Sequence, residues 1–251
     1  MVTGTMMRSR RAAAGVVAVT LACLLAGGVG CRSTNFLSTR DEVHMGREVA
    51  TEIEKQYPPM AGTADAARVA RIGEKLMPHC EPREGVPYSF KVIAQKEINA
   101  VSLPGGPVYI YRGLLDLVGK DDDALACVLA HEVGHINARH AAKQWSQQMV
   151  TNVGLIVLLK GKAQDNGSLA AGMLHLNYSR DDEFESDARG VSYAAKAGFD
   201  PNGMVRFFKK LEASTKEKGG PPEFMRTHPD TKRRIDRVER MIETQNYRYG
   251  K

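Results

Sequence analysis

The spacing of apolar side chains along the chain predicts a mostly helical protein with one small sheet. Segments whose apolar residues recur at every third or fourth position indicate helices. These segments lie at 41–57, 65–77, 149–159, 203–214 and 229–245. Apolar and more polar residues alternate over 88–95, which is typical of a strand. The turn at 104–107 separates two further extended segments. Residues 160–167 are polar and contain glycine, so they are expected to form a mobile loop.

A further helix is predicted over 124–142, a run that contains no proline and one glycine. Three aspartates precede it, and acidic side chains stabilise the N-terminus of a helix. The run contains His131-Glu132-Val133-Gly134-His135, and a helix places residues four apart on one face, so His131 and His135 are candidate ligands of one Zn²⁺. Glu132 lies about 100° round the helix and is a candidate general base. The alternative is an ordinary buried helix that carries two polar histidines.

A catalytic zinc needs a third protein ligand and an open position. Read as a helix, residues 178–190 place Glu183, Asp187 and Gly190 on one face with small and apolar neighbours. Other acidic residues of this segment point elsewhere: Asp181, Asp182 and Glu185. We therefore expect Glu183 to be the third ligand and Asp187 to accept a hydrogen bond from a ligating histidine. The alternative is an acidic cluster that only favours the helix dipole.

Four separated motifs together resemble the gluzincin endopeptidases of the HtpX-like and CAAX-prenyl-endopeptidase family. H-E-V-G-H is followed downstream by Tyr-Ser-Arg-x-x-Glu-x-x-x-Asp, while residues 99–114 are similar to the family's strand segment and residues 227–235 to its Thr-His-Pro motif. The match runs from about residue 41 to 241. The resemblance implies a zincin-like α+β domain with a small sheet beside the zinc helix, one Zn²⁺ per chain and endopeptidase activity. The chain is most similar to the short periplasmic lipoprotein branch.

The histidines outside H-E-V-G-H receive different interpretations. The resemblance makes His228 a candidate fourth zinc ligand, or a hydrogen-bond donor to the oxyanion of the transition state. Its alternative role is structural, because Pro229 is well placed as a first helical residue. His140 follows His131 by nine residues, so a continuous helix places it on the opposite face as a structural partner. We expect His175 to lie at the surface or in a loop.

The first thirty residues are expected to be a signal peptide. Basic residues at 8–11 precede the uncharged apolar stretch 12–30, and small residues then precede Cys31, as in bacterial lipoproteins. Gly28 stands where such signals usually have leucine. A lipid on Cys31 would tether a metallopeptidase domain of residues 31–251 to a membrane on the periplasmic side of the cell envelope without spanning it. The alternatives are soluble secretion after ordinary cleavage and an uncleaved anchor helix.

Charge and cysteine content limit the possible partners. Basic residues exceed acidic ones by six, and three of the arginines lie in the signal, which leaves a net charge of +3 and argues against nucleic acid. Cys80 and Cys127 remain after processing, and an exported protein could pair them or keep both as small buried side chains.

The expected function is that of a membrane-tethered zinc endopeptidase acting on envelope proteins, with protein quality control as its expected setting. Glu132 would take a proton from water and pass it to the leaving amine. The strand at 108–111 could hold an extended protein or peptide substrate by backbone pairing, or be a plain core strand. The alternative function is an envelope chaperone or assembly factor that keeps the same zinc site with proteolysis weak or shut off.

Overall fold

The structure is a computed structural model of the chain, and it describes residues 35–148, 172–174 and 176–245. Several sequence predictions fall on residues outside these ranges: the signal peptide at 1–30, Cys31, the helix at 149–159, the loop at 160–167 and His175.

The sheet has three strands, β1 (Ser89–Ile93), β2 (Ala100–Ser102) and β3 (Pro107–Tyr111), in the order β1-β3-β2. β3 pairs parallel with β1 and antiparallel with β2. Both edges of β3 are therefore occupied, and the suggestion that residues 108–111 pair with a substrate is wrong. Val108, Tyr109 and Ile110 are fully buried, as the core-strand alternative requires. β2 lies at an edge of this sheet.

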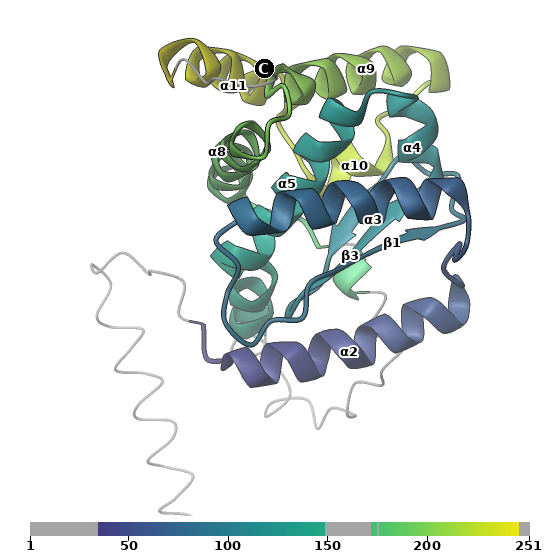
Figure 1. The fold of residues 1–251 in the computed structure, drawn as a ribbon, viewed down its shortest axis with the longest axis vertical. Helices are drawn as coiled ribbons and strands as arrows, with labels where there is room; N and C mark the ends of the chain where they lie inside the picture. Colours follow the sequence, from purple (N-terminus) through teal and green to yellow (C-terminus); the bar gives the residue numbers. More distant parts are fainter. Residues whose placement is uncertain (1–34, 149–171, 175, 246–251) are drawn as a thin grey trace, which may run out of the picture. The chain divides into compact units, whose positions relative to one another are not determined.

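Eight α-helices and a short 3₁₀ helix (Met77–His79) have bounds that the described residues define. The α-helices are α2 (Thr39–Gln56), α3 (Ala64–Leu76), α4 (Arg112–Val118), α5 (Asp122–Ala138), α8 (Arg180–Lys196), α9 (Asn202–Lys218), α10 (Glu223–Thr227) and α11 (Thr231–Gln245). Their arrangement confirms the predicted α+β class, mostly helical with one small sheet (Figure 1). The short helices α4 and α10 were not predicted.

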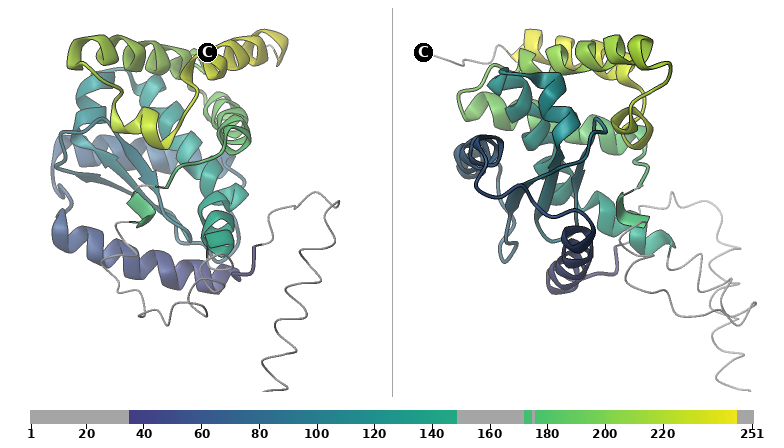
Figure 2. Two further views of the ribbon diagram at one scale, coloured as in Figure 1. Left: turned by 180° about the vertical axis from the view of Figure 1, so that it is seen from behind. Right: turned by 90° about the vertical axis from the view of Figure 1, so that its right-hand side faces the viewer.

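Helix α5 is central to the packing of the described residues. It contacts α3, α8 and α9 as well as β2 and β3, and Figure 2 shows α8 beside it. Nearly all of its side chains are buried, as expected of a helix that is apolar on every side. Asp121 caps its first turn by accepting a hydrogen bond from the backbone N–H of Ala124. The small sheet thus lies beside the helix that carries H-E-V-G-H, as predicted.

Two other features bear on the sequence predictions. Cys80 and Cys127 are both buried and free, so they do not form a disulfide. Burial raises the pKa of the Cys80 thiol to about 12, which keeps it protonated and unreactive at neutral pH. No helix within the described ranges combines the length and the apolar character needed to cross a membrane.

Candidate metal centre

Helices α5 and α8 approach each other closely because glycine stands at their contact. A Cβ atom at Gly190 of α8 would lie 2.9 Å from the backbone nitrogen of His131 and 3.0 Å from its Cα. At Gly134 of α5, a Cβ atom would lie 3.2 Å from the backbone of Ser186. Helix α8 begins with a capping box at Ser179, which accepts a hydrogen bond from the backbone of Asp182. The two motif helices therefore meet along the faces predicted from sequence.

Four side chains present ligand atoms to one point: His131, His135, Glu183 and His228. These atoms all lie within 4.8 Å of one another, and each side chain is at most 2% exposed. The Nε2 atoms of His131 and His135 are 3.0 Å apart, and Glu183 Oε1 lies 3.3 Å from His135 Nε2. His228 approaches through Nδ1, which is 2.9 Å from Glu183 Oε1 and 3.4 Å from His131 Nε2.

This arrangement fits a zinc ion. Tetrahedral zinc with bonds of about 2.0–2.1 Å holds its donor atoms about 3.3 Å apart, close to the four separations above. Imidazole and carboxylate are ordinary zinc ligands, and they must be deprotonated to bind. Burial holds the pKa of His135 well below its usual value. Burial opposes ionisation of Glu183, but the charge of Arg234 and the interactions with His228 and His135 outweigh it and hold that pKa well below its usual range.

Glu132 lies beside the four donors rather than among them. It is fully buried, and its Oε1 atom is 3.7 Å from His228 Nε2. Neither carboxylate oxygen has a hydrogen-bond partner in the described part of the chain. Leaving a buried polar group unsatisfied is costly, so an unpaired buried carboxylate calls for an explanation such as a catalytic role or a bound water or ion. Glu132 therefore lies beside the four donors, as its position on the helix predicted.

Asp187 lies behind His131, as predicted, and a residue that the sequence analysis missed lies behind Asp187. The Oδ1 atom of Asp187 is 3.0 Å from His131 Nδ1. Arg234 of α11 donates two hydrogen bonds to Asp187, of 2.7 and 2.8 Å, and its Nη1 lies 2.5 Å from Glu183 Oε2. Arg234 is only 1% exposed. The sequence did contain a sign of this role, because Arg234 lies on the apolar face of a helix, next to Ile235 and one turn before Val238.

Formal charges at the site favour a divalent cation. Three buried carboxylates, Glu132, Glu183 and Asp187, lie at the site with the guanidinium of Arg234, the one buried arginine among the described residues. With neutral histidines the group carries a net charge of −2, which one Zn²⁺ balances. Buried charges are costly unless paired or bound to metal, so the donor set and the charge balance point to the same kind of ligand.

The prediction that His140 lies on the opposite face of the helix from His131 is wrong. Helix α5 ends at Ala138, and Arg139 adopts a left-handed conformation with φ 62° and ψ 30°. A new helical segment starts at residue 140. This break turns His140 towards the metal centre, where its Nδ1 lies 2.9 Å from His135 Nδ1. His140 is not among the four donors.

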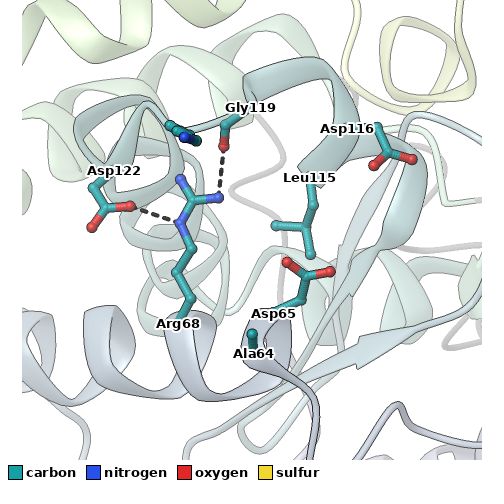
Figure 3. Close-up of a pocket in the computed structure, with 8 residues that line it drawn as sticks. Ala64, Asp65, Arg68, Leu115, Asp116, Gly119 and Asp122 are labelled. Carbon is teal, nitrogen blue, oxygen red and sulfur yellow. Dashed lines mark hydrogen bonds and ion pairs between the residues drawn. The ribbon is translucent and has the colours of Figure 1, made fainter.

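The site is closed in this structure. Tyr178, which precedes α8, stacks on His135 with ring centroids 4.0 Å apart, and Phe224 stacks on His228 at 4.3 Å. The cavity between His228, Tyr178 and strand β2 measures about 10 Å³, roughly the space of one water molecule. A larger cavity of about 440 Å³ lies elsewhere, between α3 and α4, where Arg68 binds Asp122 and the carbonyl of Gly119 (Figure 3). It contains none of the candidate residues.

The known proteins to which this chain is similar are peptidases. The sequence model of peptidase family M48 matches residues 63–242. The mitochondrial metalloendopeptidase OMA1 of Schizosaccharomyces pombe is 30% identical over 217 residues, covering 78% of this chain and 63% of that protein. OMA1 of Saccharomyces cerevisiae is 33% identical over 174 residues, covering 66% and 50%. The β-barrel assembly-enhancing protease of Escherichia coli is 26% identical over 234 residues, covering 85% and 48%. The chain therefore spans about half to two thirds of these curated relatives.

Proposed function

The chain belongs to peptidase family M48, and we propose that it is a zinc-dependent endopeptidase with its active site at the metal centre. One observation carries the proposal. His131, His135 and Glu183 converge as ligands while the buried Glu132 next to them has no partner. A purely structural zinc site needs no unpaired carboxylate beside it, whereas hydrolysis needs a base.

Each residue then has a distinct role in peptide hydrolysis. A bound zinc ion supplies a Lewis acid that polarises the scissile carbonyl and lowers the pKa of water. Glu132 accepts the proton of the attacking water and returns it to the nitrogen of the leaving amine. Asp187 Oδ1 lies 3.0 Å from His131 Nδ1, and a hydrogen bond formed across this contact would hold the ring with Nε2 facing the donor cluster. Arg234 holds both Asp187 and Glu183 in place.

His228 regulates access in this proposal. Its Nδ1 atom lies at the position of a fourth ligand, and four protein ligands leave no open position for water, as in structural zinc sites. Substrate binding therefore requires His228 to move. Its segment follows Gly219 and Gly220, which precede α10 and allow backbone rearrangement. The competing role is that of a hydrogen-bond donor to the transition-state oxyanion.

We propose a protein or peptide substrate in the bacterial envelope. Strand β2 is an edge strand beside His228, so it can pair with an extended peptide once Met173, Leu174, Leu176 and Tyr178 move away. The signal-like N-terminus supports export, and Cys31 is the proposed lipid attachment site.

The second candidate function, an envelope chaperone or assembly factor with proteolysis shut off, is favoured by the closed site and by the name of the Escherichia coli relative.

Cleavage of an unfolded protein by the zinc-loaded chain tests the proposal. Wild type should cleave the substrate. Glu132→Gln should cleave it about 10²–10⁴-fold more slowly or worse, because the general base is removed. Zinc content should stay near one per chain in both proteins, since Glu132 is not a ligand. Asp181→Asn, a change on the exposed face of α8, serves as the control. Equal rates for wild type and Glu132→Gln would reject the mechanism. A biological effect that survives Glu132→Gln would favour the assembly factor.

A further inference from the structure

The nitrogen of His135 that faces away from the donor cluster has an unusual partner. A histidine that binds a metal generally donates its other ring N–H to a carboxylate, a backbone carbonyl or water. Here Nδ1 of His135 lies 2.9 Å from Nδ1 of a second histidine, His140, which is 2% exposed. The two rings are edge to face, with centroids 5.0 Å apart.

The contact between the two Nδ1 atoms allows only one arrangement of protons that is compatible with metal binding. A hydrogen bond between two imidazole nitrogens needs one donor and one acceptor. His135 must present a bare Nε2 to a metal, so its proton lies on Nδ1, and His140 Nδ1 must accept it. The opposite arrangement would put the proton of His135 on Nε2, which is 3.0 Å from His131 Nε2 and therefore at the metal position.

The surroundings of His140 match the tautomer that this requires. With Nδ1 accepting, its own proton lies on Nε2. That nitrogen is buried and lies 3.3 Å from Asp182 Oδ1 and 3.5 Å from Glu185 Oε2, two carboxylate oxygens that favour a proton on it electrostatically, although neither contact has the geometry of a hydrogen bond. The hydroxyl of Ser186 lies 3.3 Å from Nδ1. Both carboxylates are on α8, the helix that also carries the ligand Glu183.

A single residue in left-handed conformation places His140 there. In a continuous helix His140 would lie about 140° round the axis from His135, five residues away. Arg139 instead has φ 62°, a conformation that side chains other than glycine seldom adopt. Its guanidinium is held by the buried carboxylate of Glu42 in α2 and by the backbone carbonyl of Leu37. Contacts from the N-terminal helix therefore stabilise the break.

We propose that His140 is a positioning residue that accepts the Nδ1 proton of His135 and thereby fixes the tautomer and ring orientation of that ligand. The inference rests on the proposed metal site and needs no assumption about the substrate. Its consequence is a contribution to zinc affinity from a residue that does not touch the metal. Such partners of metal ligands change affinity by about 10–100-fold when removed.

A pair of nearly isosteric substitutions tests this in the full chain. His140→Asn keeps an acceptor oxygen near the position of Nδ1, whereas His140→Leu has a similar shape and no acceptor. The zinc dissociation constant, measured by competition with a chromogenic chelator, should rise about 10–100-fold for His140→Leu and clearly less for His140→Asn. The absorption spectrum of the cobalt-substituted protein should shift in the same order. Equal zinc affinity of His140→Leu and wild type would overturn the inference, and a wild type that binds no zinc would instead reject the metal site.

A second pair of variants covers the case in which His140→Leu does not fold. Arg139→Gly and Arg139→Ala both remove the guanidinium, but only glycine adopts the left-handed conformation without strain. We expect Arg139→Gly to bind zinc more tightly than Arg139→Ala, because it retains the break that brings His140 to His135. Melting of the metal-free proteins provides the folding control. Equal affinities of two folded variants would show that the break does not position the ligand.

Discussion

Replacing Arg234 by methionine should destabilise the metal-free protein strongly. Arg234 is the only guanidinium in contact with Glu183 and Asp187 among the described residues, and all three side chains are almost completely buried. Removing one partner of a buried ion pair typically costs about 3–5 kcal/mol, because the remaining charge stays buried without compensation. For a chain of this size each kcal/mol corresponds to about 2–4 °C in Tm, so we expect a decrease of roughly 6–20 °C.

Zinc should reduce the loss of stability that Arg234→Met causes. The carboxylates and guanidinium of the metal-free site carry a net formal charge of −2, which becomes −3 in Arg234→Met, whereas bound Zn²⁺ brings the two totals to 0 and −1. Less uncompensated charge then remains in the loaded variant. Differential scanning calorimetry at neutral pH, with and without zinc, measures both effects.

Arg233→Met is the matched control for this experiment. Arg233 adjoins Arg234 on the same helix, but its side chain is 66% exposed, and among the described residues it forms one ion pair, with Asp230 at 3.6 Å. Exposed ion pairs contribute about 0–1 kcal/mol, so its Tm should stay close to that of wild type. A metal-free Arg234→Met protein as stable as Arg233→Met would refute the reasoning, as would a deficit that grows on adding zinc.

Further expectations concern the ligands, the regulation and the anchor. Glu183→Ala should lose bound zinc while Glu185→Ala keeps it, and zinc analysis of both proteins would expose a wrong ligand if loss followed Glu185. Asp187→Ala should bind zinc about 10–100-fold more weakly, measured by chelator competition. His228→Ala should raise basal cleavage and self-cleavage, seen on gels, whereas a slower variant would favour the oxyanion donor. Cys31→Ala should release the protein from the membrane fraction or block its processing, and a mature N-terminus downstream of Cys31 without an acyl group in mass spectrometry would argue against lipidation.

The sequence predicted those parts of the site that depend on local periodicity. The i, i+4 spacing of His131 and His135, and of Glu183 and Asp187, was enough to place each pair on one helix face, because both segments are regular helices at these positions. The same reasoning separated Glu183 from the more exposed Glu185. Burial of small and apolar neighbours then indicated which faces meet.

The features that were missed depend on contacts between distant segments. Arg139 adopts a left-handed conformation that ends α5, and its side chain binds Glu42, which lies 97 residues earlier in the chain. Helical spacing alone therefore placed His140 on the wrong face. Arg234 is recognisable only once α11 packs against α8 and brings it to Asp187. The central position of β3 likewise follows from strand order, which the alternation of side chains does not encode.

The most direct test of the metal centre is a crystal structure of the zinc-loaded protein with anomalous diffraction data at the zinc edge. The account predicts one anomalous peak per chain, bonded at about 2.0–2.2 Å to Nε2 of His131, Nε2 of His135 and a carboxylate oxygen of Glu183. In the resting protein Nδ1 of His228 should complete the tetrahedron, with Glu132 close by but not bound. A peak at another set of residues, or zinc held without Glu183, would contradict the account.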